Sequence, residues 1–363
     1  MKILEFPMVS GKNIEIAGKN IGPGEPVFII AEAGVNHNGS LETAKQLIDV
    51  AAEAGADAVK FQTFTAENLV TVDAEQADYQ SRNLGKKESQ FTMLKRLELP
   101  YDFHPILQAY CRTKNIIFLS TPFSEPDADF LESLHLSAFK IPSGEITNVP
   151  YLAYIAKKKK PLIVSTGMAD LVEVQTAVAT IKAEGNDEII LLHSTSNYPP
   201  SPESLNLSAI TTLYREFSVF NIPVGYSDNG SPGYVADVMA VALGACVIEK
   251  HFTLDKSLAG PDHLASMDPL ELKELVLAIR LAERMRGTGV KQSAPEEAAI
   301  MAVARKSIVA NNDIALGSII SKTDLSTRRP GTGLPPAEIS VIVGKTALRF
   351  IKQGDLLSRE DYD

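Results

Sequence analysis

Eight short apolar segments lie in the first 251 residues of the chain, and each one ends in polar or charged residues. In chain order they are VFIIAEAG, ADAVKFQT, IIFLSTP, AFKIPSGE, PLIVSTG, IILLHSTS, PVGYSD and CVIEKHF. Stretches with helical periodicity separate them, and short buried strands that alternate with helices are typical of a parallel sheet. Eight such units predict a closed (β/α)8 barrel, whose strands bring their carboxyl ends together at the face where catalysis occurs. We therefore predict an enzyme.

The length and the composition agree with a barrel enzyme. The 363 residues exceed the ~250 of one barrel, so a second, smaller domain is expected. Hydrophobic residues make up 45% of the chain, which is enough for a large core, yet no apolar run is long enough to span a bilayer. The first residues, MKILEFPMVSGK, lack the pattern of a signal peptide, and a cytoplasmic protein is expected.

The net charge indicates which partners are disfavoured, and the cysteines indicate the redox compartment. A net charge of −10 argues against nucleic acid or an anionic membrane as a partner. An anionic substrate would therefore need a local cluster of lysines and arginines. Cys111 and Cys246 lie far apart in the sequence, and we expect both to be free thiols in a reducing compartment.

Turn residues and changes of pattern divide the chain. Residues 1–286 are predicted to form the barrel domain, with residues 1–26 as a small cap on the barrel floor. A polar linker, 287–300, leads to a small β-rich domain at 301–363, in which GSIISKTDL resembles GDLLSREDY. A core of that size is marginal alone, so we expect the domain to dock on a barrel. Residues 63–91 show little apolar periodicity, and a long loop of this kind predicts a lid or a binding loop.

Two of the predicted strands end in a lysine within an otherwise apolar run, Lys60 and Lys140. Because burying an unpaired ammonium is costly, a lysine there is seldom only structural. A Schiff-base aldolase would use one desolvated lysine as its nucleophile, whereas a phosphate or carboxylate pocket would use both as positive charges. Hydroxyl side chains at nearby strand ends favour the anion pocket: Thr121, Ser143, Ser165, Thr166, Ser194 and Ser227. Ion pairs without a catalytic role are the remaining alternative.

A histidine ends the eighth segment, and other polar groups lie in neighbouring loops. His251 is followed by Asp262 and His263, and His37 lies in the loop after the first segment. Histidine with carboxylates suits a divalent metal of the Mn or Zn type, although no close His-x-His spacing occurs and a hydrogen-bonding histidine is the simpler interpretation. Glu32 ends the first segment and is either a catalytic base or the ion-pair partner of a lysine.

Seven strings occur in a fixed order along the chain: IAEAGVNHNG, VKFQTF, STPF, FKIPSGE, STGM, IEKHFTLDK with GPDH, and RRPGTG. Together they resemble the sialic acid synthases, which use phosphoenolpyruvate to make N-acetylneuraminate, legionaminate or pseudaminate. The resemblance runs from about Ile29 to the C-terminus. It implies a C-terminal domain similar to type III antifreeze protein, termed a SAF domain. It also implies a domain-swapped homodimer in which that domain caps the partner's barrel.

The resemblance further implies roles for single residues. Positions that hold the phosphate and carboxylate of phosphoenolpyruvate match Lys60, Thr121, Lys140, Ser143, Ser165 and Ser227. Positions near the amino sugar match Gln62, Tyr198 and Asp262. Arg329 matches an arginine that reaches into the other subunit's site and contacts the acylamino group, which suits a planar fork of donors. Glu32 matches a glutamate that handles a proton of water or of a hydroxyl. The expected catalytic residues are Glu32, Lys60, Lys140 and His251.

One position departs from the family pattern. Relatives commonly read Ser-Asp-His after the seventh strand, and that histidine ligates a metal beside the histidine of EKHF. This chain reads Ser227-Asp228-Asn229. Either Asn229 offers a carbonyl oxygen, which is a harder ligand suited to Mg²⁺ or Mn²⁺, or fewer protein groups hold the metal. The expected cofactor is a divalent ion at His251 and Asn229, with Mn²⁺ preferred and Mg²⁺ or Co²⁺ as alternatives.

The expected reaction joins phosphoenolpyruvate to an N-acetylated hexosamine, preferably N-acetylmannosamine, and yields a nonulosonic acid and phosphate. The alternative within the family is a legionaminate or pseudaminate synthase that takes a 2,4-diacetamido-trideoxy hexose. Two alternatives belong to other classes, a Schiff-base aldolase that uses pyruvate and a non-catalytic carbohydrate-binding protein. An aldolase would be trapped by borohydride with pyruvate, and a binding protein would release no phosphate.

Overall fold

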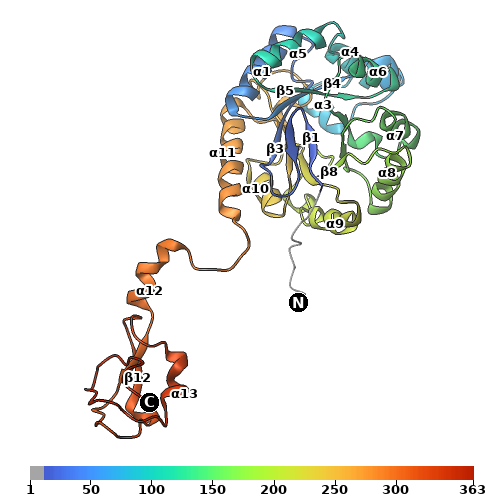
Figure 1. The fold of residues 1–363 in the computed structure, drawn as a ribbon. Coiled ribbons are helices and arrows are strands. Elements are labelled where there is room, and N and C mark those ends of the chain that lie inside the picture. The colour runs from blue at the N-terminus through green and yellow to red at the C-terminus, as the bar shows by residue number, and fades with distance from the viewer. Residues whose placement is uncertain (1–11) are drawn as a thin grey trace. The chain divides into compact units, whose positions relative to one another are not determined.

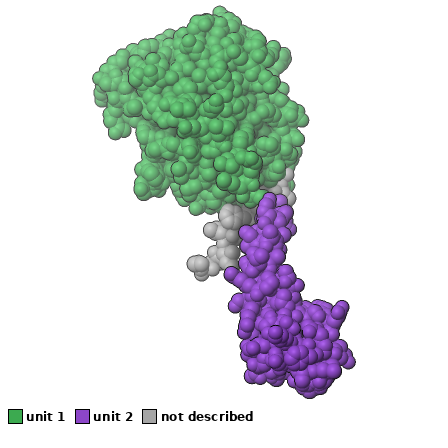
Figure 2. All heavy atoms as spheres, turned by 90° about the vertical axis from the view of Figure 1, so that its left-hand side faces the viewer, with its two compact units in different colours: residues 1–287 green, residues 288–363 purple. Residues whose placement is uncertain are grey.

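The structure is a computed structural model that describes residues 12–363, so the first part of the predicted cap lies outside the described residues. The chain forms two compact units, residues 1–287 and 288–363 (Figures 1 and 2). Each unit has its own hydrophobic core. Among residues 12–363, no helix is long and apolar enough to cross a membrane.

Eight parallel strands form the first unit, and helices surround them (Figure 1). The strands are β3 (Phe28–Gly34), β4 (Ala58–Thr63), β5 (Ile117–Pro122), β6 (Phe139–Ile141), β7 (Leu162–Ser165), β8 (Ile189–Ser194), β9 (Val224–Asp228) and β10 (Val247–His251). Their order in the sheet is β5-β4-β3-β10-β9-β8-β7-β6. The two end strands, β5 and β6, contact each other without a hydrogen-bonded ladder, so the barrel is nearly closed. The predicted (β/α)8 barrel is confirmed.

An outer helix follows each strand and covers the barrel. These helices are α1 (Leu41–Ala54), α5 (Phe103–Thr113), α6 (Glu125–Ser133), α7 (Val149–Ala156), α8 (Leu171–Ala183), α9 (Ala209–Glu216), α10 (Val235–Ala242) and α11 (Pro269–Arg286). The last helix shows why they begin and end where they do. Asp268 caps α11 and shares a capping box with Glu271, Pro269 occupies the first turn, and Gly287 follows the last residue with a positive φ.

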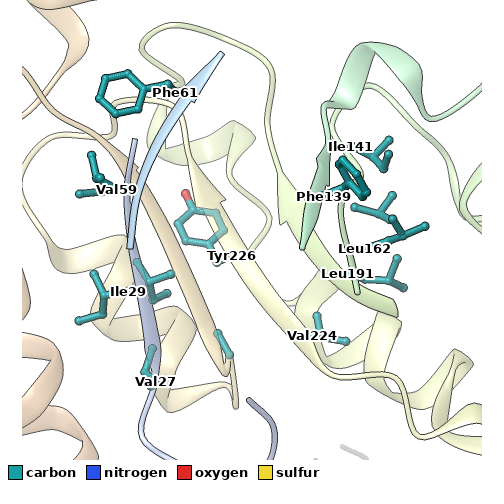
Figure 3. Packing of buried hydrophobic residues seen from close by; sticks show 14 of the residues in the cluster. Val27, Ile29, Val59, Phe61, Phe139, Ile141, Leu162, Leu191, Val224 and Tyr226 are labelled. Carbon is teal, nitrogen blue, oxygen red and sulfur yellow. The ribbon is translucent and has the colours of Figure 1, made fainter. Parts of the chain in front are cut away.

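Alternation along each strand divides the side chains between two cores. Outward-facing residues such as Ile29, Val59 and Leu191 pack under the helices (Figure 3). Inward-facing apolar residues at the amino-terminal half of the strands, Ile30 and Ile190 among them, fill the barrel floor. A hairpin of β1 (Ile14–Ile16) and β2 (Lys19–Ile21) packs its isoleucines into this inner cluster. The floor of the barrel is therefore filled and covered, and the polar ends of the strands lie at the opposite end.

The segment after β4 is more regular than its sequence indicated. It contains α2 (Ala66–Leu69), α3 (Asp78–Leu84) and α4 (Gln90–Leu97). Met93 and Leu97 of α4 pack with Phe64 and Val35 in a small apolar cluster of their own. The prediction of an irregular loop was wrong, because these three helices bury only Ala66, Met93 and Leu97, too few side chains to produce a periodic apolar pattern.

The second unit is small and built mostly from short paired segments. Its elements are α12 (Ala298–Ala304), β11 (Ser307–Ala310), β12 (Leu325–Arg328) and α13 (Ile339–Ile342). The two similar strings adopt the same turn: the Ser321 N–H donates to the Asp324 side chain at 2.8 Å, and the Ser358 N–H donates to the Asp361 side chain at 2.7 Å. The internal similarity seen in the sequence is therefore a structural repeat.

Candidate active site

A cavity of about 480 Å³ lies at the carboxyl ends of the barrel strands. Twelve of the thirteen predicted site residues line it: Glu32, Lys60, Gln62, Thr121, Lys140, Ser143, Ser165, Tyr198, Ser227, Asn229, His251 and Asp262. Strand alternation explains why the predicted strand residues share the cavity. Most of them lie an even number of positions from an inward-facing core residue of the same segment, so their side chains point to the inside of the barrel as well. The structure therefore brings the predicted residues together, while their roles stay predictions.

Lys60 lies at the centre of a buried group of charges. Its Nζ is 2.7 Å from Glu32 Oε2 and 3.5 Å from Glu249 Oε2, and it donates to Thr121 Oγ1 at 3.1 Å. Burial opposes the charge of Lys60, but the attraction of Glu249 and Glu32 prevails and raises its pKa. Lys60 is therefore a permanent positive charge at the bottom of the cavity.

Lys140 is held from the opposite side of the same group. Its Nζ donates to Ser165 Oγ at 2.6 Å and lies 3.8 Å from Glu249 Oε1. Ser227 donates to that same Glu249 oxygen at 2.8 Å. Burial lowers the pKa of Lys140 to about 8, because the partial attraction of Glu249 does not offset desolvation and the repulsion of Lys60. Lys140 is thus charged at neutral pH and loses its charge in mildly alkaline solution.

Glu249 was missed by sequence reasoning, although it joins the two lysines. Its two carboxylate oxygens lie near one lysine each, and both lysines lower its pKa despite burial. The signal was available, because Glu249 precedes His251 by two positions on one strand and so faces the same side. Lys250, between them, faces outward and pairs with Asp228 at 2.8 Å and Asp237 at 3.4 Å.

Glu32 combines the two interpretations considered for it. It pairs with Lys60, and Gln62 Nε2 donates to its Oε1 at 3.3 Å. Burial nevertheless raises the pKa of Glu32 to about 7, because desolvation outweighs the attraction of Lys60. A carboxyl group with a pKa near neutrality can accept and return a proton, which suits a general base.

His251 is buried and has an unpaired nitrogen. Its Nδ1 has no hydrogen-bond partner within residues 12–363, and burial, followed by the charge of Lys60, lowers its pKa to about 4. A Cβ added at Gly34 would lie 3.5–3.7 Å from Gln62 Nε2, Glu32 Oε1 and His251 Nδ1, so these three atoms surround one point. A neutral imidazole with a free nitrogen is the form that binds a metal.

Asn229 lies in the cavity wall, and two hydrogen bonds fix the orientation of its amide group. Its Nδ2 donates to the Thr195 carbonyl at 2.8 Å and to Ser194 Oγ at 3.2 Å, which leaves its carbonyl oxygen for another contact. Within the described residues, no group of three His, Cys, Asp or Glu side chains could hold a metal alone. An imidazole nitrogen and an amide oxygen fit an ion that takes further ligands from a substrate. The metal site stays a prediction.

The histidines near this region have other roles. The His37 Nδ1 accepts from the Gly39 N–H at 2.9 Å, and His263 Nδ1 forms a 2.7 Å hydrogen bond with Thr253. Neither histidine lines the cavity. Thr166, one of the hydroxyl residues at strand ends, donates to the Leu192 carbonyl and also lies outside it.

Aromatic residues form one end of the cavity. The rings of Tyr198 and His251 meet edge to face at 5.7 Å, and Tyr79 of α3 stacks on Tyr198 at 5.0 Å. Asp262 lines the cavity with them, and burial raises its pKa to about 6. Tyr79 is not among the site residues predicted from the strand ends and motifs, because it is on a helix far from any strand end.

Arg329 is the one predicted site residue outside this cavity. It belongs to the second unit, where its side chain is exposed and its Nε donates to the Ala304 carbonyl at 3.0 Å. Its contact with a sugar in another subunit stays a prediction. The two cysteines, by contrast, are free and buried, as expected.

Comparison with known proteins extends over the whole chain. The NeuB family matches residues 47–291 and the SAF domain matches residues 305–362. The N,N'-diacetyllegionaminic acid synthase of Legionella pneumophila is 52% identical over 96% of this chain and 98% of its own length. The Campylobacter jejuni protein of the same name is 46% identical, over 91% of this chain and 98% of its own.

A solved structure supports the same assignment. The sialic acid synthetase of Leptospira borgpetersenii superposes with a TM-score of 0.71 at 34% identity, over 80% of this chain and 95% of that one. The cavity contains the lysines, hydroxyls and glutamate that the sequence motifs predicted, at the catalytic end of the barrel. The chain therefore belongs to the NeuB family of synthases, which condense phosphoenolpyruvate with a sugar, and it carries a C-terminal SAF domain.

Proposed function

We propose that the protein condenses phosphoenolpyruvate with the open-chain aldehyde of an uncharged 2,4-diacetamido-trideoxy hexose. The products are a nine-carbon 2-keto acid of the legionaminate type and phosphate. The two buried lysines that Glu249 joins at the bottom of the cavity carry the proposal. Two relatives named as legionaminate synthases, at 52% and 46% identity, support this acceptor over N-acetylmannosamine, the first expectation from the sequence.

Phosphoenolpyruvate suits the charged end of the cavity. Its phosphate and carboxylate are two anionic groups, and Lys60 and Lys140 are two buried cations. Thr121, Ser165 and Ser227 already hydrogen-bond members of this charge group and can donate to substrate oxygens. Holding both substrates in one cavity removes much of the entropic barrier to their reaction.

The proposed chemistry proceeds in three bond changes. The enol carbon of phosphoenolpyruvate attacks the aldehyde carbon, and the aldehyde oxygen takes up a proton and becomes a hydroxyl. This leaves an oxocarbenium-like centre at the carbon that carries the phosphate ester, and a water molecule adds to it. The carbon–oxygen bond to the phosphate then breaks, which forms the keto group and releases phosphate.

Glu32 is the proposed base for the water molecule. Its carboxylate lies beside Lys60, so it faces the same anionic groups that the lysine holds. Its pKa of about 7 allows it to take a proton as water adds and to release it afterwards. Glu249 remains ionised and keeps Lys60 charged through the same steps.

His251 Nδ1 and the carbonyl oxygen of Asn229 are the groups that would hold a divalent ion in this proposal. Such an ion would supply Lewis acidity to the aldehyde oxygen. The protein groups by themselves orient the site: Ser194 and Thr195 fix the Asn229 amide, and the Tyr198 ring packs against the His251 ring.

The test measures phosphate release from phosphoenolpyruvate with Mn²⁺ present. Three acceptors are compared: 2,4-diacetamido-2,4,6-trideoxymannose, N-acetylmannosamine and N-acetylmannosamine 6-phosphate. We expect the highest kcat/KM with the diacetamido sugar. A higher value with either monoacetamido sugar would reject the proposed acceptor and keep the synthase chemistry.

Two controls separate the other classes of function. Borohydride in the presence of pyruvate should trap no covalent adduct at Lys60 or Lys140, whereas a Schiff-base aldolase would be trapped. Sugar binding without phosphate release in folded protein would point to a binding protein instead.

A further inference from the structure

One aromatic residue of the cavity wall comes from the helix α3 and not from the end of a barrel strand. Tyr79 lies in the first turn of α3 and lines the cavity together with Gln80. The start of the helix is capped by the Ala77 N–H, which donates to Gln80 Oε1 at 3.0 Å, and near its end Asn83 Nδ2 donates to the Pro261 carbonyl at 2.6 Å. The second bond ties α3 to the loop that carries Asp262.

The Tyr79 ring continues a row of rings that starts at the reacting end. It stacks on Tyr198 with ring centres 5.0 Å apart and an angle of 21° between the planes, and Tyr198 meets His251 edge to face. Stacked rings of this kind present a flat apolar surface with a hydroxyl at the edge. Burial, followed by the charge of Asp262, raises the pKa of Tyr79, so its hydroxyl remains a donor.

The charges at this aromatic end differ from those at the lysine end. Among the described residues that line the cavity, Lys60 and Lys140 are the cations, and both belong to the buried group around Glu249. At the aromatic end Asp262 is an acceptor, and within residues 12–363 no group donates to its carboxylate. A phosphate would meet a carboxylate there, whereas an amide N–H would find an acceptor.

The cavity wall contributed by α4 is mostly apolar. Met93, Leu94 and Leu97 line the cavity together with Gln90 at the start of the helix, and Met93 and Leu97 belong to the small buried cluster around Phe64. Methyl groups fit the apolar part of such a wall better than charged or hydroxyl groups. A planar amide with a methyl group therefore matches three features of this cavity: a flat ring, a free carboxylate and apolar side chains.

We propose that Tyr79 is a specificity-determining residue that selects an acceptor with a second, uncharged acylamino group. The amide plane lies on the Tyr79 ring, and its N–H donates to Asp262. This inference rests on the proposed function, since it names the group that distinguishes a diacetamido acceptor from N-acetylmannosamine in the same site.

The experiment compares wild-type protein with Tyr79→Ala and Tyr79→Phe. For each protein, kcat/KM is measured with the diacetamido sugar and with N-acetylmannosamine, together with the KM for phosphoenolpyruvate. Tyr79→Ala should lower kcat/KM for the diacetamido sugar by roughly 10- to 100-fold, the range for one recognised group in a pocket, and should change the other acceptor by less than about threefold. The KM for phosphoenolpyruvate should not change. Tyr79→Phe keeps the ring and should keep most of the preference.

Tyr154→Ala is the matched control, because Tyr154 is on the outer helix α7 and pairs with Asp129 away from the cavity. Equal losses with both acceptors in Tyr79→Ala would show a structural role and overturn the inference. A wild-type protein without preference for the diacetamido sugar, measured by calorimetric binding as well as by turnover, would also overturn it. A third outcome separates the two proposals: the wild-type protein binds the diacetamido sugar selectively but releases no phosphate, and Tyr79→Ala loses this selective binding. That outcome would reject the proposed reaction and retain Tyr79 as the residue that selects the acceptor.

Discussion

At the scale of the residue, three consecutive polar residues at the end of β10 show that strand geometry decides which side chains reach the cavity. Glu249 and His251 face the cavity, and Lys250 faces the helices. Sequence reasoning chose His251 and left out Glu249, because it considered only the end of the segment. Alternation along the strand predicts that Glu249 faces the same side as His251. Lys60 and Lys140 were found because a lysine within an apolar run is conspicuous in any sequence.

The stacking of Tyr79 on Tyr198 could not be predicted from the sequence. The two residues are more than a hundred positions apart, and no local pattern connects the two rings. Contacts of this kind depend on how loops fold over the barrel mouth. They become visible only in three dimensions.

The pH dependence of kcat/KM for phosphoenolpyruvate should be bell-shaped. Glu32 must be ionised to accept a proton, and its pKa is raised to about 7, so the rate should rise as the pH increases through that value. Lys140 must be charged to hold an anion, and its pKa is lowered to about 8, so the rate should fall above that value. Initial rates across the pH range test both limbs. A flat profile above pH 8 would exclude Lys140 as the alkaline group.

Asn229→His should strengthen divalent metal binding. A second imidazole beside His251 replaces an amide oxygen with a better ligand for Mn²⁺ or Zn²⁺, and we expect Kd to fall by roughly tenfold, or about 1.4 kcal/mol. Isothermal titration of the substrate-free protein with each metal measures this directly. His251→Ala serves as the reference for a lost site. Weaker binding in Asn229→His would contradict the placement of Asn229 at the metal.

At the scale of the element, a buried ion group joins β9, β10 and α10. Lys250 contacts Asp228 of β9 and Asp237 of α10, and it donates to the Ser231 carbonyl at 3.0 Å. Asp228 in turn accepts from the Gly230 and Ser231 N–H groups. This group therefore fixes the turn that places Asn229 in the cavity wall.

Lys250→Met should destabilise the barrel strongly. The change leaves Asp228 and Asp237 buried without their cation, which costs about 3–5 kcal/mol. Chemical denaturation measures the free energy of unfolding of Lys250→Met and of a control, Lys256→Met. The control removes a partly exposed ion pair with Glu271 and should cost less than about 1 kcal/mol. Similar losses in the two variants would show that the buried group is not a structural anchor.

Elements differed in how well their sequences predicted them. The eight strands were predictable, because each is a short apolar run between helices, and the capping residues Asp268 and Pro269 mark the start of α11. The helices α2 to α4 were not, because each buries at most two side chains, whereas the equally short barrel helices α7, α9 and α10 bury four each. Local pattern therefore predicts the barrel, and tertiary packing determines the segment over its mouth.

At the scale of the whole molecule, two units carry different parts of the predicted site. The barrel unit holds the lysines, the glutamates and the aromatic end, and the SAF domain holds Arg329. Both domains were predictable from motifs and from the internal repeat. The assembly that would bring Arg329 to a sugar, a domain-swapped dimer, remains a prediction from the family resemblance.

Arg329→Ala should raise the KM for the acceptor sugar and leave the KM for phosphoenolpyruvate unchanged. Loss of a charge-assisted hydrogen bond to an acylamino group corresponds to about 1.5–3 kcal/mol, or roughly 10- to 100-fold. Arg328→Ala is the matched control, since the neighbouring arginine is exposed in the same unit. Unchanged acceptor kinetics in Arg329→Ala would refute the predicted contact.

The hairpin that fills the barrel floor also bears on the order of events in one turnover. With Ile14, Ile16 and Ile21 packed into the inner cluster, the described residues leave the mouth at the other end as the route to the lysines. We therefore expect phosphoenolpyruvate to bind before the sugar that would cover it, and phosphate to leave after the sugar acid. Initial-rate inhibition should then show phosphate competing with phosphoenolpyruvate and not with the acceptor. A random order of binding would contradict the expectation that a barrel closed at one end fills from the bottom.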